Sequence, residues 1–157
     1  MTFDKNGYLT PYEIIEISLD EFEEFFVLNL EDQTHRQKLF DSYQLFLDEI
    51  YDLIGNNFFQ LINGSFTTQK LKPKDIDVVT FIDYKILNRF EDEIDHLSER
   101  SKKEFNLDAF FAPHCEPGHP YFIHAQLIFD YWKNFFSYSR KDKNGVHNPK
   151  GLFKIKF

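Results

Sequence analysis

Two aspartates, Asp75 and Asp77, flank a single isoleucine inside an apolar run that otherwise has the composition of a buried strand. Side chains alternate between the two faces of a strand, so both carboxylates should project from the same face. Two ionised carboxylates at such a short separation repel each other, and burial raises the free-energy cost of both charges. A cation bound between the two carboxylates removes this cost. Hard oxygen ligands on short side chains suit Mg²⁺, or Mn²⁺ in its place. We therefore predict that Asp75 and Asp77 are metal ligands.

A Gly-Ser pair, Gly64 and Ser65, follows an apolar run and precedes Asp75 by nine intervening residues. Glycine lets the backbone come close to a phosphate, while the serine hydroxyl and the amides of the following turn can donate hydrogen bonds. A metal site beside a phosphate-binding turn is the arrangement used for in-line phosphoryl or nucleotidyl transfer. Of the lysines in between, we expect Lys70 to lie near a bound triphosphate, with a solvated loop as the alternative.

This stretch resembles the signature of the DNA polymerase β-type nucleotidyltransferase superfamily. The signature is an apolar residue, Gly-Ser or Gly-Gly, a spacer, and then Asp-x-Asp or Asp-x-Glu among apolar residues. Here it reads Ile62, Gly64-Ser65, nine residues and Asp75-Ile76-Asp77-Val78, with Asn63 interposed before the glycine. The resemblance covers residues 58–111 and implies a palm-like α/β fold, a small mixed central sheet with flanking helices.

The resemblance also implies a third carboxylate on a later strand. Asp108 sits between apolar residues in the expected place, so we expect it to complete the catalytic and metal-binding set with Asp75 and Asp77. Glu104 and Asp83 remain alternatives. In this assignment Asp108 accepts the proton of the attacking hydroxyl, while Gly64, Ser65 and Lys70 bind the nucleotide.

The activity implied is transfer of a nucleoside monophosphate from a nucleoside triphosphate, with ATP expected, to a hydroxyl of a protein or of RNA such as tRNA. The layout also looks like that of small bacterial members of the superfamily, which suggests a toxin-antitoxin or phage-defence setting in the cytoplasm. The nucleotidyltransferases that act as antitoxins usually have one more residue between Gly-Ser and the first aspartate. A protein of the same fold that works only by docking to a partner is the alternative.

The charge distribution limits the choice of partner. Among 157 residues, 26 acids and 18 bases give a net charge of −8, which argues against a general DNA-binding protein. Residues 140–157 nevertheless carry six bases and one acid, and a local basic end suits a phosphate-bearing ligand. Residues 1–53 carry 13 acids and three bases, so this region should repel bare RNA and favour a protein acceptor.

We predict one domain, 1–157, in three parts: an N-terminal helical region (1–55), the core motif (56–112), and a C-terminal helix and strand with a basic end (113–157). Apolar periodicity and capping residues predict helices over 18–30, 33–54, 84–103 and 121–137, with a helical turn at 66–71. Strands are predicted over 58–62, 76–83, 105–113 and 151–157. No apolar run is long enough to cross a membrane.

Other reactive residues have weaker claims. His114, Cys115, His119 and His124 lie close in sequence, but their spacing matches no standard zinc finger, and Pro117 and Gly118 indicate a turn. Cys115 is also a weak candidate nucleophile. Tyr131 and Trp132 lie on an amphipathic helix and are expected to pack, although an adenine could stack on an aromatic ring there.

Overall fold

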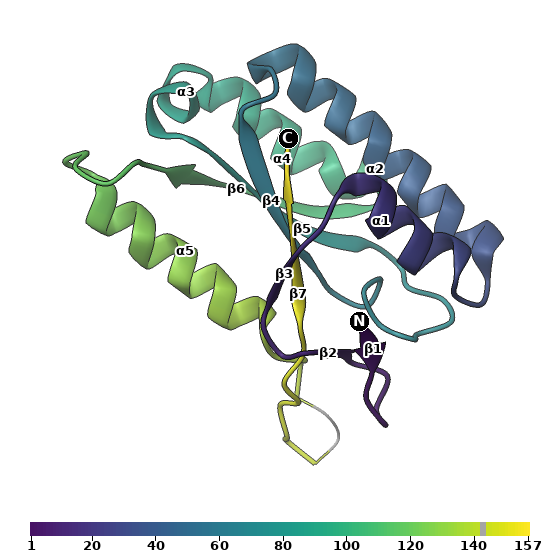
Figure 1. Ribbon diagram of the computed structural model, residues 1–157. Coiled ribbons are helices and arrows are strands. Elements are labelled where there is room, and N and C mark those ends of the chain that lie inside the picture. Colours follow the sequence, from purple (N-terminus) through teal and green to yellow (C-terminus); the bar gives the residue numbers. More distant parts are fainter. Residues whose placement is uncertain (142–143) are drawn as a thin grey trace.

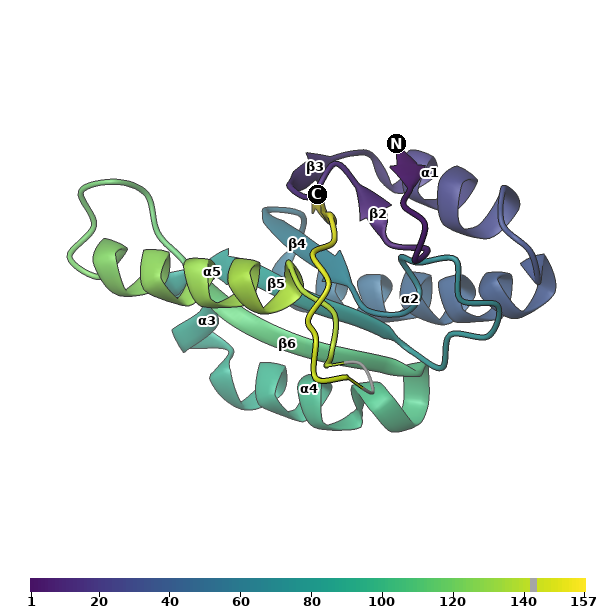
Figure 2. The same cartoon turned by 90° about the horizontal axis from the view of Figure 1, so that it is seen from below.

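The computed structural model describes residues 1–141 and 144–157, and its centre is a five-stranded mixed sheet with helices on both faces (Figure 1, Figure 2). The strands are β1 (Thr2–Phe3), β2 (Leu9–Thr10), β3 (Ile14–Glu16), β4 (Phe58–Asn63), β5 (Ile76–Asp83), β6 (Leu107–His114) and β7 (Leu152–Lys156). The helices are α1 (Leu19–Glu23), the π-helix η1 (Glu24–Leu28), α2 (Gln33–Ile54), α3 (Tyr84–Arg89), α4 (Glu91–Phe105) and α5 (Phe122–Phe136).

The strand order of the sheet is β3-β7-β4-β5-β6. Strand β4 runs antiparallel to both of its neighbours, whereas β6 pairs with β5 and β3 pairs with β7 in parallel. Strand β5 is rich in β-branched and aromatic residues and lies second from one edge, which is why almost all of its side chains are buried. Strands β1 and β2 form a separate two-stranded sheet.

Alternation along the strands divides the apolar side chains between two cores. One core joins the sheet to α1, η1, α2 and α4, and it contains Phe26, Phe40, Ile62, Val78 and Leu107. The second core is smaller and lies under α5, where it contains Leu61, Val79, Phe81, Ala112 and Phe136. Figure 2 shows α5 lying across one side of the sheet. The odd-numbered residues of β5 therefore face α5, and Asp77 is one of them.

The predicted region of N-terminal helices needs correction, because residues 1–16 form β1, β2 and β3 before the first helix begins. Strand β3 joins the sheet by pairing Ile14 with Leu152 of β7, a contact with the far end of the chain that leaves no local sequence signal. The first helix begins with a capping box, which its sequence start Ser18-x-x-Glu21 predicts: Ser18 Oγ accepts from Glu21 N at 3.1 Å, and Glu21 Oε2 accepts from Ser18 N at 2.7 Å.

The predicted helix over 18–30 is divided, because α1 passes into the π-helix η1 at Glu24. The predicted helix over 84–103 is also wrong as a single element, since Phe90 leaves helical geometry with φ −115° and ψ 30° and separates α3 from α4. In place of the helical turn predicted at 66–71, the structure has a turn over residues 66–69. Helix α2 and strand β5 have the predicted bounds, and Gly55 ends α2 with a positive φ of 76°.

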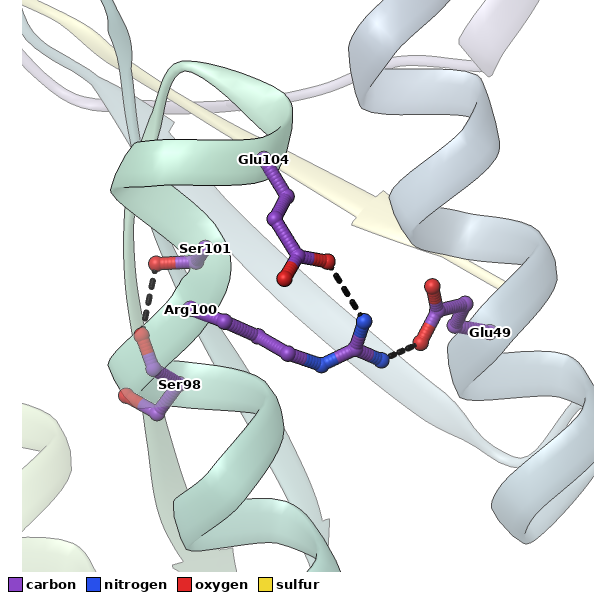
Figure 3. A network of polar contacts seen from close by, with 5 residues as sticks. All are labelled: Glu49, Ser98, Arg100, Ser101 and Glu104. Carbon is purple, nitrogen blue, oxygen red and sulfur yellow. Dashed lines mark hydrogen bonds and ion pairs between the residues drawn. The ribbon is translucent and has the colours of Figure 1, made fainter.

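An arginine holds α4 against α2 and so fixes the element that leads into β6. Arg100 of α4 forms ion pairs with Glu49 of α2 and, at 2.6 Å, with Glu104 one turn further along α4 (Figure 3). Ser101 donates to the Ser98 carbonyl at 2.7 Å and to the Leu107 carbonyl at 3.1 Å, which ties the end of α4 to the first residue of β6. Asp108 follows directly.

Within residues 1–141 and 144–157, no helix is both long enough and apolar enough to span a bilayer.

Candidate functional site

The register of three strands brings the predicted carboxylates and the Gly-Ser turn together. Asn63, the last residue of β4, pairs with Asp77 of β5, and Asp77 in turn pairs with Asp108 of β6. Asp77 and Asp108 lie side by side on parallel strands and therefore point to the same face of the sheet. Asp75 precedes β5 by one residue and lies close enough to Asp77 to raise its pKa.

Gly64 lies directly against the Asp77 carboxylate. A Cβ built on Gly64 would stand 1.7 Å from Asp77 Oδ2 and 2.6 Å from its Cγ, so no other residue fits without displacing the carboxylate. Gly64 also has a φ of +90°, a conformation that side chains with a Cβ rarely adopt. The glycine of the motif is thus required both by its backbone conformation and by its contact with the Asp77 carboxylate.

Asp77 is a partly buried member of the cluster. Burial, together with the neighbouring Asp75 and Asp108, raises its pKa to about 6, although Lys150 acts in the opposite direction. A pKa this high means that the metal-free fold disfavours the ionised form of Asp77. Such a carboxylate is one that a cation would stabilise.

Two lysines supply positive charge from opposite sides. Lys102 Nζ on α4 lies 3.7 Å from Asp75 Oδ2 and 3.8 Å from Asp108 Oδ1, and so joins these carboxylates from the solvent side. Lys150, just before β7, is 8% exposed, and its Nζ donates to the Gly64 carbonyl at 3.4 Å. Burial lowers the pKa of Lys150 to about 8, and Asp77 opposes this shift.

The donor set matches the chemistry of a hard divalent cation. Asp75, Asp77 and Asp108 offer oxygen atoms, the ligands that Mg²⁺ and Mn²⁺ prefer. In the described part of the chain, no three histidine, cysteine, aspartate or glutamate side chains are already arranged around a common metal position. Asp75 and Asp108 instead form ion pairs with Lys102, and the donor chemistry of the three aspartates fits the predicted cation.

Side chains on both sides fix the turn that carries Ser65. Asn63 donates through Nδ2 to the Phe136 carbonyl at the end of α5, and its Oδ1 accepts from Gly64 N at 2.6 Å. Thr68 Oγ1 donates to the Ser65 carbonyl at 2.8 Å. The amide of Ser65 itself makes no hydrogen bond within residues 1–141 and 144–157. The turn is therefore held by its carbonyls and by Asn63.

Arg36 of α2 is the main anchor of this turn, and the sequence analysis missed it. Its Nη1 donates to the carbonyls of Phe26 (3.0 Å) and Phe66 (2.7 Å), and its Nη2 to those of Thr68 (2.9 Å) and Lys70 (2.8 Å). The guanidinium also lies 5.1 Å from the centre of the Phe66 ring. Burial lowers the Arg36 pKa to about 10, although Asp32 raises it in part. Arg36 continues the apolar row of α2 that contains Phe40 and Tyr43. This position is the sequence feature that indicates its burial.

Lys70 lies at the far end of the same turn. It lines a cavity of about 270 Å³ together with Leu30, Glu31, Arg36, Gln69 and Leu71. The predicted basic end of the chain is also divided: Lys150 reaches the Gly64 carbonyl, whereas Lys154 Nζ lies 4.3 Å from the centre of the Phe59 ring. Asp142 and Lys143 of that stretch lie outside the described residues. Lys150 is thus the lysine that the structure places beside Asp77.

The alternative carboxylates lie elsewhere. Glu104 is paired with Arg100 on α4, and Asp83, at the opposite end of β5 from Asp77, accepts from Lys85 N at 2.8 Å and begins α3. The histidines near Cys115 have other contacts: His119 Nδ1 accepts from Tyr121 N at 3.1 Å, and His124 stacks on the Tyr121 ring. Among the carboxylates considered, Asp108 is the one that lies next to Asp77.

The fold and the site together define an α/β protein in which the neighbouring strands β5 and β6 hold an acidic cluster beside a glycine turn. The chain belongs to DUF6932, a family of unknown function, which it matches over residues 1–156. No curated protein and no solved structure matches it.

Proposed function

We propose that this protein is a metal-dependent nucleotidyltransferase with a palm-like fold, which moves a nucleoside monophosphate from a nucleoside triphosphate to a hydroxyl group. The observation that carries the proposal is the contact between Gly64 and the Asp77 carboxylate, with Asp108 beside Asp77 in the sheet. A glycine backbone next to a row of carboxylates allows phosphates and a metal ion to bind side by side.

The roles of the residues follow from their positions. Asp75, Asp77 and Asp108 would hold Mg²⁺ or Mn²⁺, which would offset phosphate charge and help to align the reacting groups. Ser65 would donate a hydrogen bond from its hydroxyl to the outer phosphates, and its amide makes no hydrogen bond within the described residues that would compete with them. Lys150 adds a buried positive charge next to Gly64. Lys70 remains a proposed ligand of the outermost phosphate.

The proposed reaction is an in-line displacement at the α-phosphate. The acceptor oxygen forms a new bond to the α-phosphorus, the bond from this phosphorus to the bridging oxygen breaks, and pyrophosphate leaves with the electron pair. The Asp108 carboxylate accepts the hydroxyl proton. Asp108 suits this role because β6 is the edge strand and its side chain is about one-third exposed, whereas Asp77 lies deeper.

We propose ATP as the donor and a protein hydroxyl on serine, threonine or tyrosine as the acceptor. The acidic N-terminal region favours a basic protein surface over bare tRNA, because its carboxylates repel the negatively charged phosphates of RNA. A partner from a toxin-antitoxin or phage-defence pair in the bacterial cytoplasm would present such a hydroxyl. A partner that holds this hydroxyl in line with the α-phosphate would supply much of the rate acceleration of the transfer.

Thermal shift tests the nucleotide site. ATP, GTP, CTP and UTP are each added with Mg²⁺ or Mn²⁺, and binding to the native state should raise the melting temperature. The double variant Asp75→Asn, Asp77→Asn should fold at least as stably as wild type in EDTA, because it removes a repulsion, and should lose the response. Absence of a shift for every nucleotide with both metals would contradict the proposal.

Label transfer from α-labelled ATP tests the acceptor. The protein is incubated with the product of the adjacent gene, with total tRNA, and with each alone. Label on the partner protein that disappears with Asp77→Asn supports the proposed acceptor. Label on tRNA would support the proposed reaction and contradict the choice of a protein acceptor.

A second candidate function is docking without catalysis. The observation in its favour is the outward row of α5, where Ile123 is 70% and Leu127 is 62% exposed. Apolar residues exposed side by side are typical of protein-binding surfaces. A tight complex with the partner protein, and no label transfer under any nucleotide, would favour this alternative.

A further inference from the structure

An aromatic cluster borders the acidic site on the side of α5. Phe110 lies two residues after Asp108 on β6, so its side chain projects from the same face about 7 Å further along the strand. The Trp132 ring of α5 lies 4.8 Å from the Phe110 ring and 5.9 Å from the Phe135 ring, centre to centre. We define the aromatic cluster as Phe110, Tyr131, Trp132 and Phe135.

Contacts connect this cluster to the Gly-Ser turn, and strand β6 connects it to Asp108. Trp132 packs against the Phe136 ring at 5.7 Å, and the Phe136 carbonyl accepts the hydrogen bond of Asn63, the residue before Gly64. The acidic site is thus linked to the aromatic cluster through β6 and through the end of α5. Any ligand with phosphates at Gly64 would have the cluster as its apolar neighbour.

The cluster is exposed to an extent that packing alone does not account for. Phe110 is 39% exposed on the edge strand, and Tyr131 and Phe135 are each 60% exposed. Other phenylalanines of this sheet, such as Phe81 and Phe153, are buried. Exposed aromatic rings beside a charged site form a surface that a flat, aromatic ligand can cover.

We propose that Phe110 and Trp132 form the stacking surface for the nucleobase of the bound nucleoside triphosphate. The inference rests on the proposed function, which places the phosphates at Gly64 and Asp77, and it adds the position of the base. One ribose separates the α-phosphate from the base, and this spacing matches the step along β6 from Asp108 to Phe110. Stacking tolerates every base, and purines should bind more tightly because their rings are larger.

Trp132 is the only tryptophan in the chain and therefore reports directly on the cluster. Its fluorescence, excited where nucleotides do not absorb, is followed during titration with MgATP and, in parallel, with magnesium tripolyphosphate. We expect MgATP to quench Trp132 and tripolyphosphate to bind without quenching. Affinities of both ligands are measured separately by calorimetry. If neither ligand binds, the proposed function fails. If MgATP binds and Trp132 does not respond, this inference alone is overturned.

Substitutions at Phe110 supply the second test. Phe110→Leu should weaken MgATP binding about tenfold and leave tripolyphosphate binding unchanged, whereas Phe110→Tyr should retain wild-type affinity because the ring is kept. Leu127→Ala is the matched control, an exposed apolar residue on α5 outside the cluster. Equal loss of both ligands in Phe110→Leu would contradict the inference. So would a change of Trp132 fluorescence with protein concentration alone, since that result would assign the cluster to a contact between two copies of the chain.

Discussion

The backbone of Gly64 lies against the side chain of Asp77, so that a Cβ on Gly64 would stand 1.7 Å from Asp77 Oδ2. The register of the sheet imposes this contact, because Asn63 pairs with Asp77 across β4 and β5 and Gly64 follows Asn63. Two parts of the motif that are distant in sequence therefore depend on each other in space. The proposed chemistry requires this relationship.

Gly64→Ala should abolish the nucleotide response and destabilise the fold by about 1–3 kcal/mol, because the methyl group meets the Asp77 carboxylate in a strained conformation. Gly55→Ala is the matched control. Gly55 also has a positive φ, of 76°, but no atom lies within 4 Å of an added Cβ. It should lose only the stability that the strain costs and keep nucleotide binding. Urea denaturation and thermal shift with MgATP measure both effects, and equal loss of binding in the two variants would contradict the assigned contact.

Asp77 should make the stability of the metal-free protein depend on pH. Its folded pKa of about 6 lies above the unfolded value of about 3.9, so the unfolded chain loses its proton first as the pH rises. Its contribution to the free energy of unfolding should therefore fall between about pH 4 and pH 6 and then level off. Asp77→Asn should match wild type near pH 4 and exceed it by about 1–3 kcal/mol above pH 7. Denaturation in EDTA across this range tests the sign, and a less stable variant at pH 7.5 would refute it.

The two C-terminal lysines should behave differently. Lys150→Met should weaken MgATP binding and flatten its salt dependence, because Lys150 is buried at the Gly64 carbonyl. Lys154→Met should leave the affinity close to wild type, since its ammonium group lies over the Phe59 ring. Calorimetric titration at low and moderate salt separates them. An unchanged affinity for Lys150→Met at low salt would show that this lysine does not contact the phosphates.

Arg36 should be required for the conformation of the Gly-Ser turn even without nucleotide. Arg36→Met leaves the carbonyls of Phe66 and Thr68 buried without their donor and removes the bond to the Lys70 carbonyl, which should cost about 3 kcal/mol or more. Arg36→Lys should recover only part of this loss, because an ammonium group lacks the planar fork of a guanidinium. Arg89→Met, on the exposed side of α3, is the control. Hydrogen exchange at Gln69 and Lys70 should accelerate in the Arg36 variants alone, and normal protection there would contradict the anchoring role.

The sequence was informative where local pattern and chemistry agree. The β-branched run of β5 predicted its bounds. Strand parity predicted that Asp75 and Asp77 share a face, although Asp75 lies one residue before β5, and the neighbouring position of Asp108 came from the family resemblance. It was uninformative where structure depends on distant contacts: β3 pairs with β7 across most of the chain, and the burial of Lys150 depends on packing at Gly64. Arg36 was overlooked because charge was read as exposure, although its place in the apolar row of α2 indicated burial.

Calorimetric titration with a non-hydrolysable ATP analogue, in the presence and absence of Mg²⁺, tests the central claim most directly. The account predicts that wild type binds the analogue only with Mg²⁺ or Mn²⁺, and that Asp77→Asn, folded and at least as stable in EDTA, does not bind it. Removal of divalent cations with EDTA should abolish binding of the analogue to wild type. Binding that is equally tight with and without metal, or that survives in Asp77→Asn, would contradict the assignment of Asp75, Asp77 and Asp108 as a metal-dependent nucleotide site.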